Sequence, residues 1–362
     1  MGSQIGKTFK TTVFGESHGT AVGCVIEGIP AGTVLDMAHI KKRMSQRRPG
    51  QGTHSTPRQE KDSFEIVSGL VEDVTTGTPL TMLIRNHDTR SKDYSRTKDL
   101  MRPSHADFTG HVKWDGNNDY RGGGHFSARL TAALVFSGAI AEQLLKAMGI
   151  DILTQIESIG SQTAESLVIR PELESLRMAF DEKGIWISSE HEASFLEEVE
   201  QARSELDSVG GVVETIVTGM PVGIGGPMFD TIEGRLSYGL FGIPAVKGIS
   251  FGDGFAFGAA RGSEVNDAFG IKEGQIVTET NHNGGINGGI SNGMPIHFRC
   301  VFKPTPSIAR EQKTVNIKTM TEETLQIEGR HDPCVAIRGA IVVKAVTAMT
   351  LYDLIRTEAP HV

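Results

Sequence analysis

The chain has 362 residues, of which 38% are hydrophobic and 22% are charged, a composition typical of a soluble globular protein. No apolar run approaches the roughly 18 residues that a membrane-spanning helix needs, which argues against a transmembrane protein. The formal net charge of −8 argues against a protein whose main role is to coat nucleic acid.

The first residues and the cysteines predict a cytoplasmic protein. Residues 1–19 lack the succession of basic, apolar and small residues that marks a signal peptide. Cys24, Cys300 and Cys334 are widely spaced and form no CxxC pattern, so we expect neither a disulfide framework nor a zinc site. No HxxxH or HExxH spacing occurs either, and no bound metal is expected.

Apolar periodicity predicts the elements of the first part of the chain. A strand at 20–27 is followed by a helix over 36–48, which Asp36 caps and a Pro-Gly pair ends. Strands near 62–70 and 78–84 come next, because apolar and polar residues alternate there.

The later elements include two long helices, over about 127–148 and about 333–356, that are apolar around most of their circumference and should be buried. An amphipathic helix is expected over about 190–207, and strands near 152–159, 211–218 and 294–302. Strands and helices do not alternate regularly enough for a doubly wound parallel sheet. The sequence therefore predicts an α+β fold with antiparallel β-sheets packed on long central α-helices, a β-α-β sandwich, in a single domain over residues 1–362.

Five histidines lie among glycines or charged residues. They are His18 in GESHG, His105 in RPSHAD, His125 in RGGGHFSAR, His282 in NHNGG and His331 in GRHDP. One histidine beside a glycine can simply stabilise a turn, but five such settings favour chemistry. Because histidine titrates near neutral pH, it can protonate a leaving group such as phosphate.

Cationic residues in the same motifs predict a small ligand with several negative charges. They are Arg102, Arg121, Arg129 and Arg330, joined by Lys303 and by the basic run at 41–58. Guanidinium groups bind carboxylates and phosphates as a fork. The basic run would also suit a solvated helix face. The glycines of RGGG could add backbone amides to an anion site, although a tight turn into the following helix would require them equally well.

Ten motifs, in this order, resemble those of the chorismate synthase family over nearly the whole chain. They are TTVFGESHG, RRPG, RPSHAD, DYRGGGHFSAR, PAVKG, GDGF, RGSE, NGGINGGISNG, FKPTPSI and GRHDPCV. Each motif alone is weak, but the ordered set is highly specific.

The resemblance implies a 1,4-anti-elimination of phosphate from 5-enolpyruvylshikimate 3-phosphate, which gives chorismate in the last common step of the shikimate pathway of aromatic amino acid biosynthesis. Such an enzyme is a carbon–oxygen lyase acting on phosphates, with no net redox change. The substrate carries two carboxylates and a phosphate, which suits the predicted anion site. No adjacent carbonyl stabilises loss of the ring hydrogen, and the family uses reduced FMN as a transient electron donor.

The resemblance also implies roles for five catalytic residues. His18 would protonate the leaving phosphate, with Ser17 beside it in a proton relay. His105 would keep the reduced flavin suitably protonated, and Asp332 would help the flavin N5 take up the ring hydrogen. Ser127 is the fifth catalytic residue that the resemblance implies. For Asp332 the sequence leaves a second role open, as N-cap of the last helix, since Pro333 would stand at the first helical position.

The ligand contacts follow from the same motifs. Those implied for FMN are His125, Phe126, Ser127, Pro244, Ala245, Gly288, Lys303, Pro304, Thr305, Pro306, Ser307 and Arg330. Those implied for the substrate anions are Arg47, Arg48, Arg102, Arg121 and Arg129.

The resemblance further implies a homotetramer. It leaves the source of electrons open between direct use of NADPH and a separate flavin reductase. Thr53 stands where the family often has an arginine associated with nicotinamide-cofactor or anion binding.

Two other functions compete with elimination. A flavin oxidoreductase would use the same FMN pocket and consume NAD(P)H stoichiometrically. A non-catalytic binding module for anionic metabolites would need neither His18 nor His105 for turnover. The order of the motifs favours elimination, because neither alternative explains it.

Overall fold

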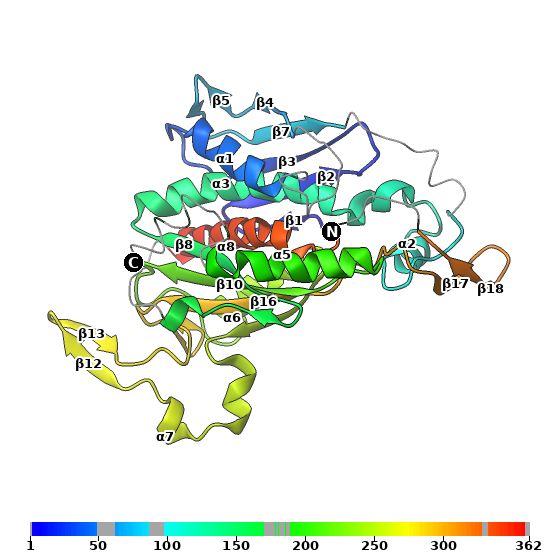
Figure 1. Ribbon diagram of the computed structural model, residues 1–362. Coiled ribbons are helices and arrows are strands. Elements are labelled where there is room, and N and C mark those ends of the chain that lie inside the picture. Colours follow the sequence, from blue (N-terminus) through cyan, green and yellow to red (C-terminus); the bar gives the residue numbers. More distant parts are fainter. Residues whose placement is uncertain are drawn as a thin grey trace.

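Two antiparallel sheets enclose a layer of helices in the computed structural model, which describes residues 2–48, 62–86, 98–169, 178, 180, 185, 189–327 and 332–358 (Figure 1). The α+β sandwich predicted from the sequence is therefore confirmed. All the ladders within the two sheets are antiparallel.

The first sheet has the strand order β1-β2-β3-β7-β4. Its strands are β1 Gln4–Ile5, β2 Lys10–Gly15, β3 Ala21–Glu27, β4 Phe64–Ser68 and β7 Leu80–Arg85, and a small hairpin of β5 Leu70–Val71 and β6 Val74–Thr75 lies nearby (Figure 1). Val22, Cys24 and Ile26 of the central strand β3 are fully buried at alternate positions. This spacing places them on one face of the sheet, which packs on the helices.

The second sheet has the strand order β11-β16-β10-β8-β9. Its strands are β8 Asp151–Ile159, β9 Gln162–Thr163, β10 Gly211–Thr218, β11 Val246–Phe251 and β16 Ile296–Phe302. The central strand β10 is buried on both faces. On β10, Glu214 is fully buried and accepts a hydrogen bond from His297 Nε2 at 2.8 Å. A buried carboxylate is tolerated there because it is paired and hydrogen-bonded.

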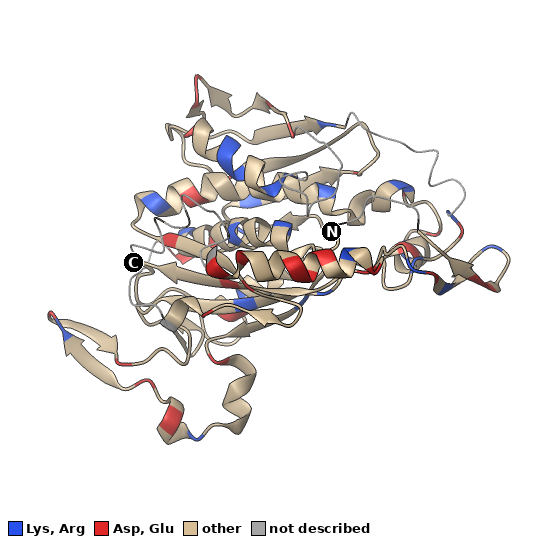
Figure 2. Cartoon of the chain, in the orientation of Figure 1, with Lys and Arg blue, Asp and Glu red and all other residues tan. Residues whose placement is uncertain are grey.

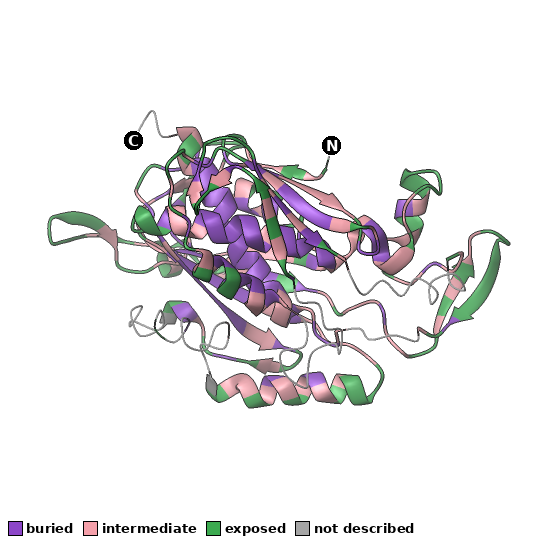
Figure 3. Cartoon of the chain, turned by 90° about the horizontal axis from the view of Figure 1, so that it is seen from above, coloured by how far each residue is buried: buried purple, intermediate pink, exposed green. Residues whose placement is uncertain are grey.

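Two apolar helices, α3 Thr131–Ala147 and α8 Ala336–Glu358, form the centre of the sandwich (Figures 1 and 3). They cross closely at Gly138, where a Cβ would lie 2.4 Å from the Cα of Ala345. The segment Ala128–Ala147 has the length and hydropathy of a membrane span, with a mean hydropathy of 1.3, but 72% of its most apolar window is buried inside the molecule. Its apolar composition is therefore accounted for by its place in the core.

Two further helices, α1 Met37–Arg47 and α6 Ile232–Leu240, pack against this pair. Helix α5 Ser189–Ser204 packs instead on β8 and β9 of the second sheet. As expected, Asp36 caps α1, accepting hydrogen bonds from the amides of Ala38 and His39. Helix α5 packs Phe195 and Val199 inward and carries acidic residues along its other side (Figure 2).

The sequence misplaced the starts of both central helices by a few residues. The helix expected from 127 begins as the 3-10 turn η3 Ala128–Leu130, and α-helix starts only at Thr131. The last helix starts at Ala336 and not at Pro333. Asp332 therefore stands too far from the first turn to be its N-cap, and that alternative role was wrong.

Two projections extend from the sandwich (Figure 1). The first, called the arm here, covers residues 252–283 and contains η5 Gly254–Ala259, α7 Gly262–Val265, β12 Phe269–Lys272 and β13 Gln275–Thr278. A short hairpin of β14 Ile286–Asn287 and β15 Ile290–Ser291 follows it. The second projection contains α2 Asp107–Lys113 and the hairpin of β17 Gln312–Asn316 and β18 Thr321–Leu325.

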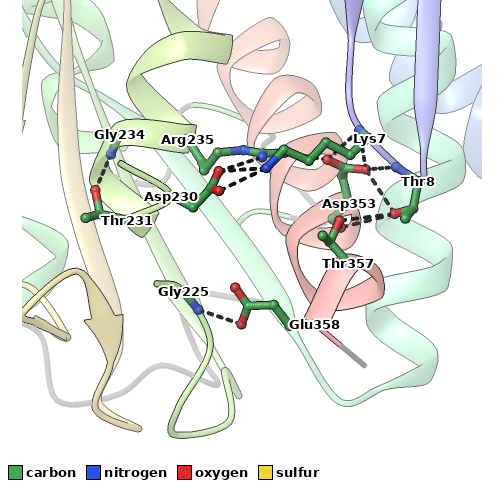
Figure 4. Close-up of polar contacts among 10 residues, drawn as sticks. All are labelled: Lys7, Thr8, Gly225, Asp230, Thr231, Gly234, Arg235, Asp353, Thr357 and Glu358. Carbon is green, nitrogen blue, oxygen red and sulfur yellow. Dashed lines mark hydrogen bonds and ion pairs between the residues drawn. The ribbon is translucent and has the colours of Figure 1, made fainter. Parts of the chain in front are cut away.

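An ionic cluster anchors the N-terminal segment and α6 at the C-terminal end of α8 (Figure 4). The buried carboxylate of Asp353 accepts hydrogen bonds from the backbone amides of Lys7, Thr8 and Phe9 and from Arg235 Nη2 at 2.6 Å. Because α8 has 23 residues, it spans roughly 35 Å, and this cluster lies far from the helix's N-terminal end.

Candidate active site

A turn of three glycines separates two of the predicted catalytic histidines. Gly122, Gly123 and Gly124 lie in the 3-10 segment η2 Arg121–Phe126 and all have positive φ. A Cβ on Gly122 would lie 2.1 Å from the imidazole of His18, and one on Gly123 would lie 3.4 Å from His105 Cε1. Glycine is therefore required at position 122 both for its backbone conformation and to leave room for His18.

His18 is held in a buried turn after β2. Its side chain is 6% exposed, and Ser17 beside it is fully buried. The Ser17 amide donates to Gly124 O at 3.1 Å, which ties the turn to the glycines. Ser17 Oγ is buried and has no hydrogen-bond partner among the described residues. A buried hydroxyl without a hydrogen-bond partner lowers the stability of the fold unless a bound ligand supplies that partner.

His105 belongs to a network with a carboxylate and a guanidinium. Its Nδ1 lies 2.6 Å from Asp107 Oδ1, and Arg102 donates to both oxygens of Asp107 at 2.7 Å. Burial alone would raise the pKa of Asp107, but the hydrogen bonds from Arg102 and His105 outweigh it and hold that pKa well below its usual range. His105 Nδ1 also lies 3.0 Å from Arg102 Nη2, so this nitrogen is engaged by the network, and Nε2 is the ring nitrogen on the side of Gly123.

A second network joins two of the predicted substrate arginines. Arg47 at the end of α1 and Arg129 in η3 both donate to the carboxylate of Asp62, and all three side chains are almost completely buried. Burial lowers the pKa of Arg47 to about 10, although Asp62 opposes the shift, and repulsion from Arg338 and Arg129 contributes. Burial would raise the pKa of Asp62, but the two guanidinium groups outweigh it and lower that pKa.

Asp332 and Arg338 extend this network to the N-terminal end of α8. Arg338 Nη1 donates to Asp332 Oδ2, and Arg338 Nε donates to the backbone carbonyl of Arg47 at 3.2 Å. Among the described residues, Arg47 and Arg129 thus share the carboxylate of Asp62, while Arg338 pairs with Asp332. Guanidinium groups gathered in this way suit an anionic ligand.

The loop after β16 contains the residues predicted to hold FMN and fits an anionic ligand. Lys303 Nζ donates to Ser104 O at 2.6 Å, and its amide donates to Ala245 O at 3.0 Å. Burial, with repulsion from Lys247, lowers the pKa of Lys303. Thr305 Oγ1 is buried without a hydrogen-bond partner among the described residues. A phosphate-bearing cofactor would bind to the neighbouring ammonium groups of Lys303 and Lys247 and would accept a hydrogen bond from the Thr305 hydroxyl.

Pro244 and Ala245 lie beside this loop at the start of β11. Ala245 has a φ of 72°, in the left-handed region that a residue with a side chain rarely adopts. Its carbonyl accepts from the Lys303 amide, so the strained residue is held against the loop. Backbone strain like that of Ala245 is often found at ligand sites.

Ser307 connects the same loop to the network of His105, because its Oγ accepts a hydrogen bond from Arg102 Nη1 at 3.3 Å.

His125 and Phe126 follow the glycine turn but are engaged within the chain. His125 Nδ1 lies 2.9 Å from Gly15 O, and its Nε2 lies 2.9 Å from Ser3 Oγ. Phe126 packs on Trp114, with ring centroids 5.2 Å apart. Both side chains therefore stabilise the glycine turn through contacts within the chain.

Most of the predicted site residues come together at the N-terminal end of α8. Hydrogen bonds and close contacts connect Ser17, His18, Arg47, Arg102, His105, Ser127, Arg129, Ala245, Lys303, Ser307 and Asp332 through the glycine turn and the two networks. Pro244, Pro304, Thr305 and Pro306 are next to members of this set in the chain. Ser127 Oγ accepts from the Arg129 amide at 3.3 Å and so caps η3.

The remaining predicted site residues are placed differently. Arg48 ends α1. Arg121 is 39% exposed and pairs with Asp119 at 2.8 Å. Gly288 lies between β14 and β15, next to Gly289, whose carbonyl accepts from the first amide of α6. This hairpin is at the end of the molecule that carries Asp353, so one chain does not bring Gly288 to the other residues. Arg330 and Thr53 lie outside the described residues.

Three charged residues of the site were missed from the sequence: Asp62, Asp107 and Arg338. Asp107 lies inside the RPSHAD motif, and its spacing of two residues from His105 was the available signal. Asp62 and Arg338 carried no such signal, because their partners are distant in the chain. Within the described ranges, no group of three or more His, Cys, Asp or Glu residues is placed to hold a metal ion.

Comparison with known proteins gives a consistent result over the whole chain. The family model described as chorismate synthase matches residues 9–355. The chorismate synthase of Dehalococcoides mccartyi is 45% identical over 98% of this chain and 96% of its own, and that of Methanobrevibacter smithii is 42% identical over 100% and 98%. A solved structure described as a crystal structure of chorismate synthase is 28% identical, with a TM-score of 0.76 over 98% of this chain and 93% of that one.

Proposed function

The chain belongs to the chorismate synthase family, and we propose a role in its reaction for each of the residues gathered at the N-terminal end of α8. The enzyme is a lyase of the shikimate pathway. It removes phosphate from 5-enolpyruvylshikimate 3-phosphate by 1,4-anti-elimination to give chorismate, and it depends on reduced FMN. When bound, reduced FMN supplies transient electron density for a C–H bond that no neighbouring carbonyl activates.

The observation that carries the proposal is that His18 and His105 lie against neighbouring glycines of one turn, close to a buried cluster of guanidinium groups. Proton-transfer groups and anion-binding groups must share one site if phosphate is to leave a polyanionic substrate. Arg47, Arg129 and Arg102 are proposed to bind the substrate's carboxylates and phosphate, with Arg48 and Arg121 at the rim. Guanidinium forks suit this ligand better than ammonium groups do.

His18 is proposed as the general acid that protonates the departing phosphate. Its buried position excludes water from the proton transfer, and the unsatisfied hydroxyl of Ser17 next to it is suited to relay a proton. Protonation lowers the negative charge that develops on the departing phosphate, so a positioned acid lowers the barrier to C–O cleavage.

His105 and Asp332 are proposed to act on the cofactor side of the site. Asp107 and Arg102 engage His105 Nδ1, so Nε2 is the nitrogen proposed to face a ligand across Gly123. Asp332 is proposed to assist the removal of the ring hydrogen from that side. Ser127, beside the glycine turn, is proposed to assist in the same region.

The residues proposed to hold FMN are Ser127, Pro244, Ala245 and the loop 303–307, with His125 and Phe126 behind the glycine turn and Arg330 added from the family motif. The two ammonium groups of Lys247 and Lys303 support a phosphate there. The strained Ala245 supports a ligand beside the loop. The route by which FMN is reduced is proposed to be either NADPH directly or a separate flavin reductase.

A homotetramer is proposed for the assembly. The arm exposes large apolar side chains, with Phe255 94%, Ile271 82% and Ile276 71% exposed, and such a surface favours contact with another protein chain. Assembly would also explain the predicted contact of Gly288 with FMN. Its hairpin is far from the site of its own chain, so it would contact the FMN bound by another copy. Light scattering of purified protein should give about four times the monomer mass of 39.0 kDa, and a monomer would contradict this proposal.

The location is proposed to be cytoplasmic. Cys24, Cys300 and Cys334 are free thiols, all buried. Burial raises the pKa of Cys300 to about 12 and that of Cys334 to about 11, so these thiols are unreactive. Unpaired thiols suit a reducing compartment.

An anaerobic assay tests the function. Purified protein is mixed with photoreduced FMN and 5-enolpyruvylshikimate 3-phosphate, and phosphate release and the diene absorbance of chorismate are followed together. Both should rise without net oxidation of the flavin. Stoichiometric consumption of the reductant would indicate an oxidoreductase instead. Turnover with FMN and NADPH alone would favour direct use of NADPH, and a requirement for added flavin reductase would favour the partner.

A further inference from the structure

Arg338 joins three segments that the proposed mechanism uses separately. It lies in the first turn of α8, where Nη1 donates to the Asp332 carboxylate and Nε donates to the backbone carbonyl of Arg47 at 3.2 Å. The side chains of Arg338 and Asp332 are only 19% and 14% exposed. One guanidinium thus connects Asp332, the start of α8 and the end of α1.

The position of Arg338 is unfavourable for the stability of the fold by itself. The N-terminal end of a helix carries partial positive charge, and a cation in the first turn is disfavoured there. Repulsion between Arg338 and Arg47 contributes to the lowered pKa of Arg47. Like charges gathered in a buried region are often found where a site requires them.

The geometry of the two bonds requires a guanidinium. Nε and Nη1 lie in one rigid plane. The hydrogen bond from Nε to the carbonyl oxygen of Arg47 therefore also fixes the direction in which Nη1 points, and the bond from Nη1 then fixes the orientation of the Asp332 carboxylate. A lysine ammonium is a single point of charge and does not hold both partners in this way.

We propose that Arg338 is a positioning residue for the elimination, holding the Asp332 carboxylate in the orientation in which it acts. This inference rests on the proposed role of Asp332. The alternative is that Arg338 only fastens α1 to α8. The two differ in what is lost on substitution: the first predicts slower chemistry, and the second predicts lower stability with normal chemistry in the folded fraction.

The chain offers a matched control at the other end of the same helix. Arg235 of α6 donates to the buried carboxylate of Asp353 at 2.6 Å and so also connects a neighbouring segment to α8 (Figure 4). Arg235→Gln should lower the melting temperature through loss of a buried ion pair, yet leave turnover unchanged at a temperature where the protein stays folded.

The experiment compares Arg338→Gln, Arg338→Lys and Arg235→Gln for kcat, substrate KM, FMN affinity by fluorescence titration, and thermal unfolding. Arg338→Gln should lower kcat about 10- to 100-fold, as misplacement of a reacting group does, with FMN affinity and KM changed less than about threefold. Arg338→Lys should recover only part of this loss. A wild-type kcat in folded Arg338→Gln, with a melting temperature lowered as in Arg235→Gln, would overturn the proposal.

Asp332→Asn and the double variant Arg338→Gln/Asp332→Asn separate this inference from the role of Asp332. If Arg338 acts through Asp332, the double variant should be no slower than Asp332→Asn alone, because the two effects are not independent. Losses that multiply in the double variant would overturn the positioning role and leave that of Asp332 intact. Wild-type kcat in Asp332→Asn would reject the role of Asp332 and, with it, the inference about Arg338.

Discussion

Replacing His18 by alanine should lower kcat about 10²- to 10⁴-fold, the usual contribution of a general acid. His18 lies against Gly122 in a buried turn, so its imidazole is held in one place and cannot easily be replaced by another group or by bulk water. The loss should appear in phosphate release under anaerobic conditions with photoreduced FMN. FMN affinity, measured by fluorescence titration, should change little.

The control for this variant is His191→Ala. His191 lies on α5, stacked on Phe195 with ring centroids 6.0 Å apart, and its removal also takes away a partly buried imidazole. It should retain wild-type kcat. The general-acid assignment fails if His18→Ala turns over as fast as His191→Ala, or if its loss of activity is explained entirely by weaker FMN binding.

Replacing Glu142 by glutamine should lower the free energy of unfolding by about 3–5 kcal/mol, the typical cost of breaking a buried ion pair by removing one partner. Glu142 of α3 is 8% exposed, lies 2.9 Å from Arg43 Nε of α1 and 3.5 Å from Lys344 Nζ of α8, and so joins three helices. Glutamine has nearly the same shape but leaves both cations buried without their counterion. Urea unfolding followed by circular dichroism, at one fixed protein concentration, measures the difference.

The effect of Glu142 should depend on pH. Burial would raise its pKa, but Lys344 and Arg43 outweigh this and lower the pKa from 4.5 to about 2. The carboxylate therefore stabilises the fold fully above the unfolded value of 4.5, and this contribution is lost as pH falls towards 2. The difference in unfolding free energy between the wild type and Glu142→Gln should therefore shrink as the pH falls from 4.5 towards 2.

An exposed ion pair provides the comparison for Glu142. Glu65 and Arg85 lie 3.2 Å apart, with 54% and 53% of their side chains exposed. Glu65→Gln should change the unfolding free energy by less than about 1 kcal/mol, because solvent screens the pair. If Glu142→Gln cost no more than Glu65→Gln, the three-helix junction would contribute little to stability.

The sequence by itself determined the class of fold, the family and the reaction. Buried residues at alternate positions mark β3, apolar residues on both faces mark β10, and continuous apolar composition marks α3 and α8, because the pattern of burial is repeated in the local sequence. Motifs such as RPSHAD are likewise local, so their order along the chain indicated the chemistry before any contact was known.

Only the tertiary structure decided which charged groups meet. The contact of His18 with Gly122, the sharing of Asp62 between Arg47 and Arg129, and the attachment of Arg338 all join residues distant in the chain.

The same holds for the placement of Gly288 at the opposite end of α8 from Asp332. A hydrogen bond or ion pair depends on distances of a few ångströms in space, and these are set by how the sheets and helices pack, which no local pattern of residues records.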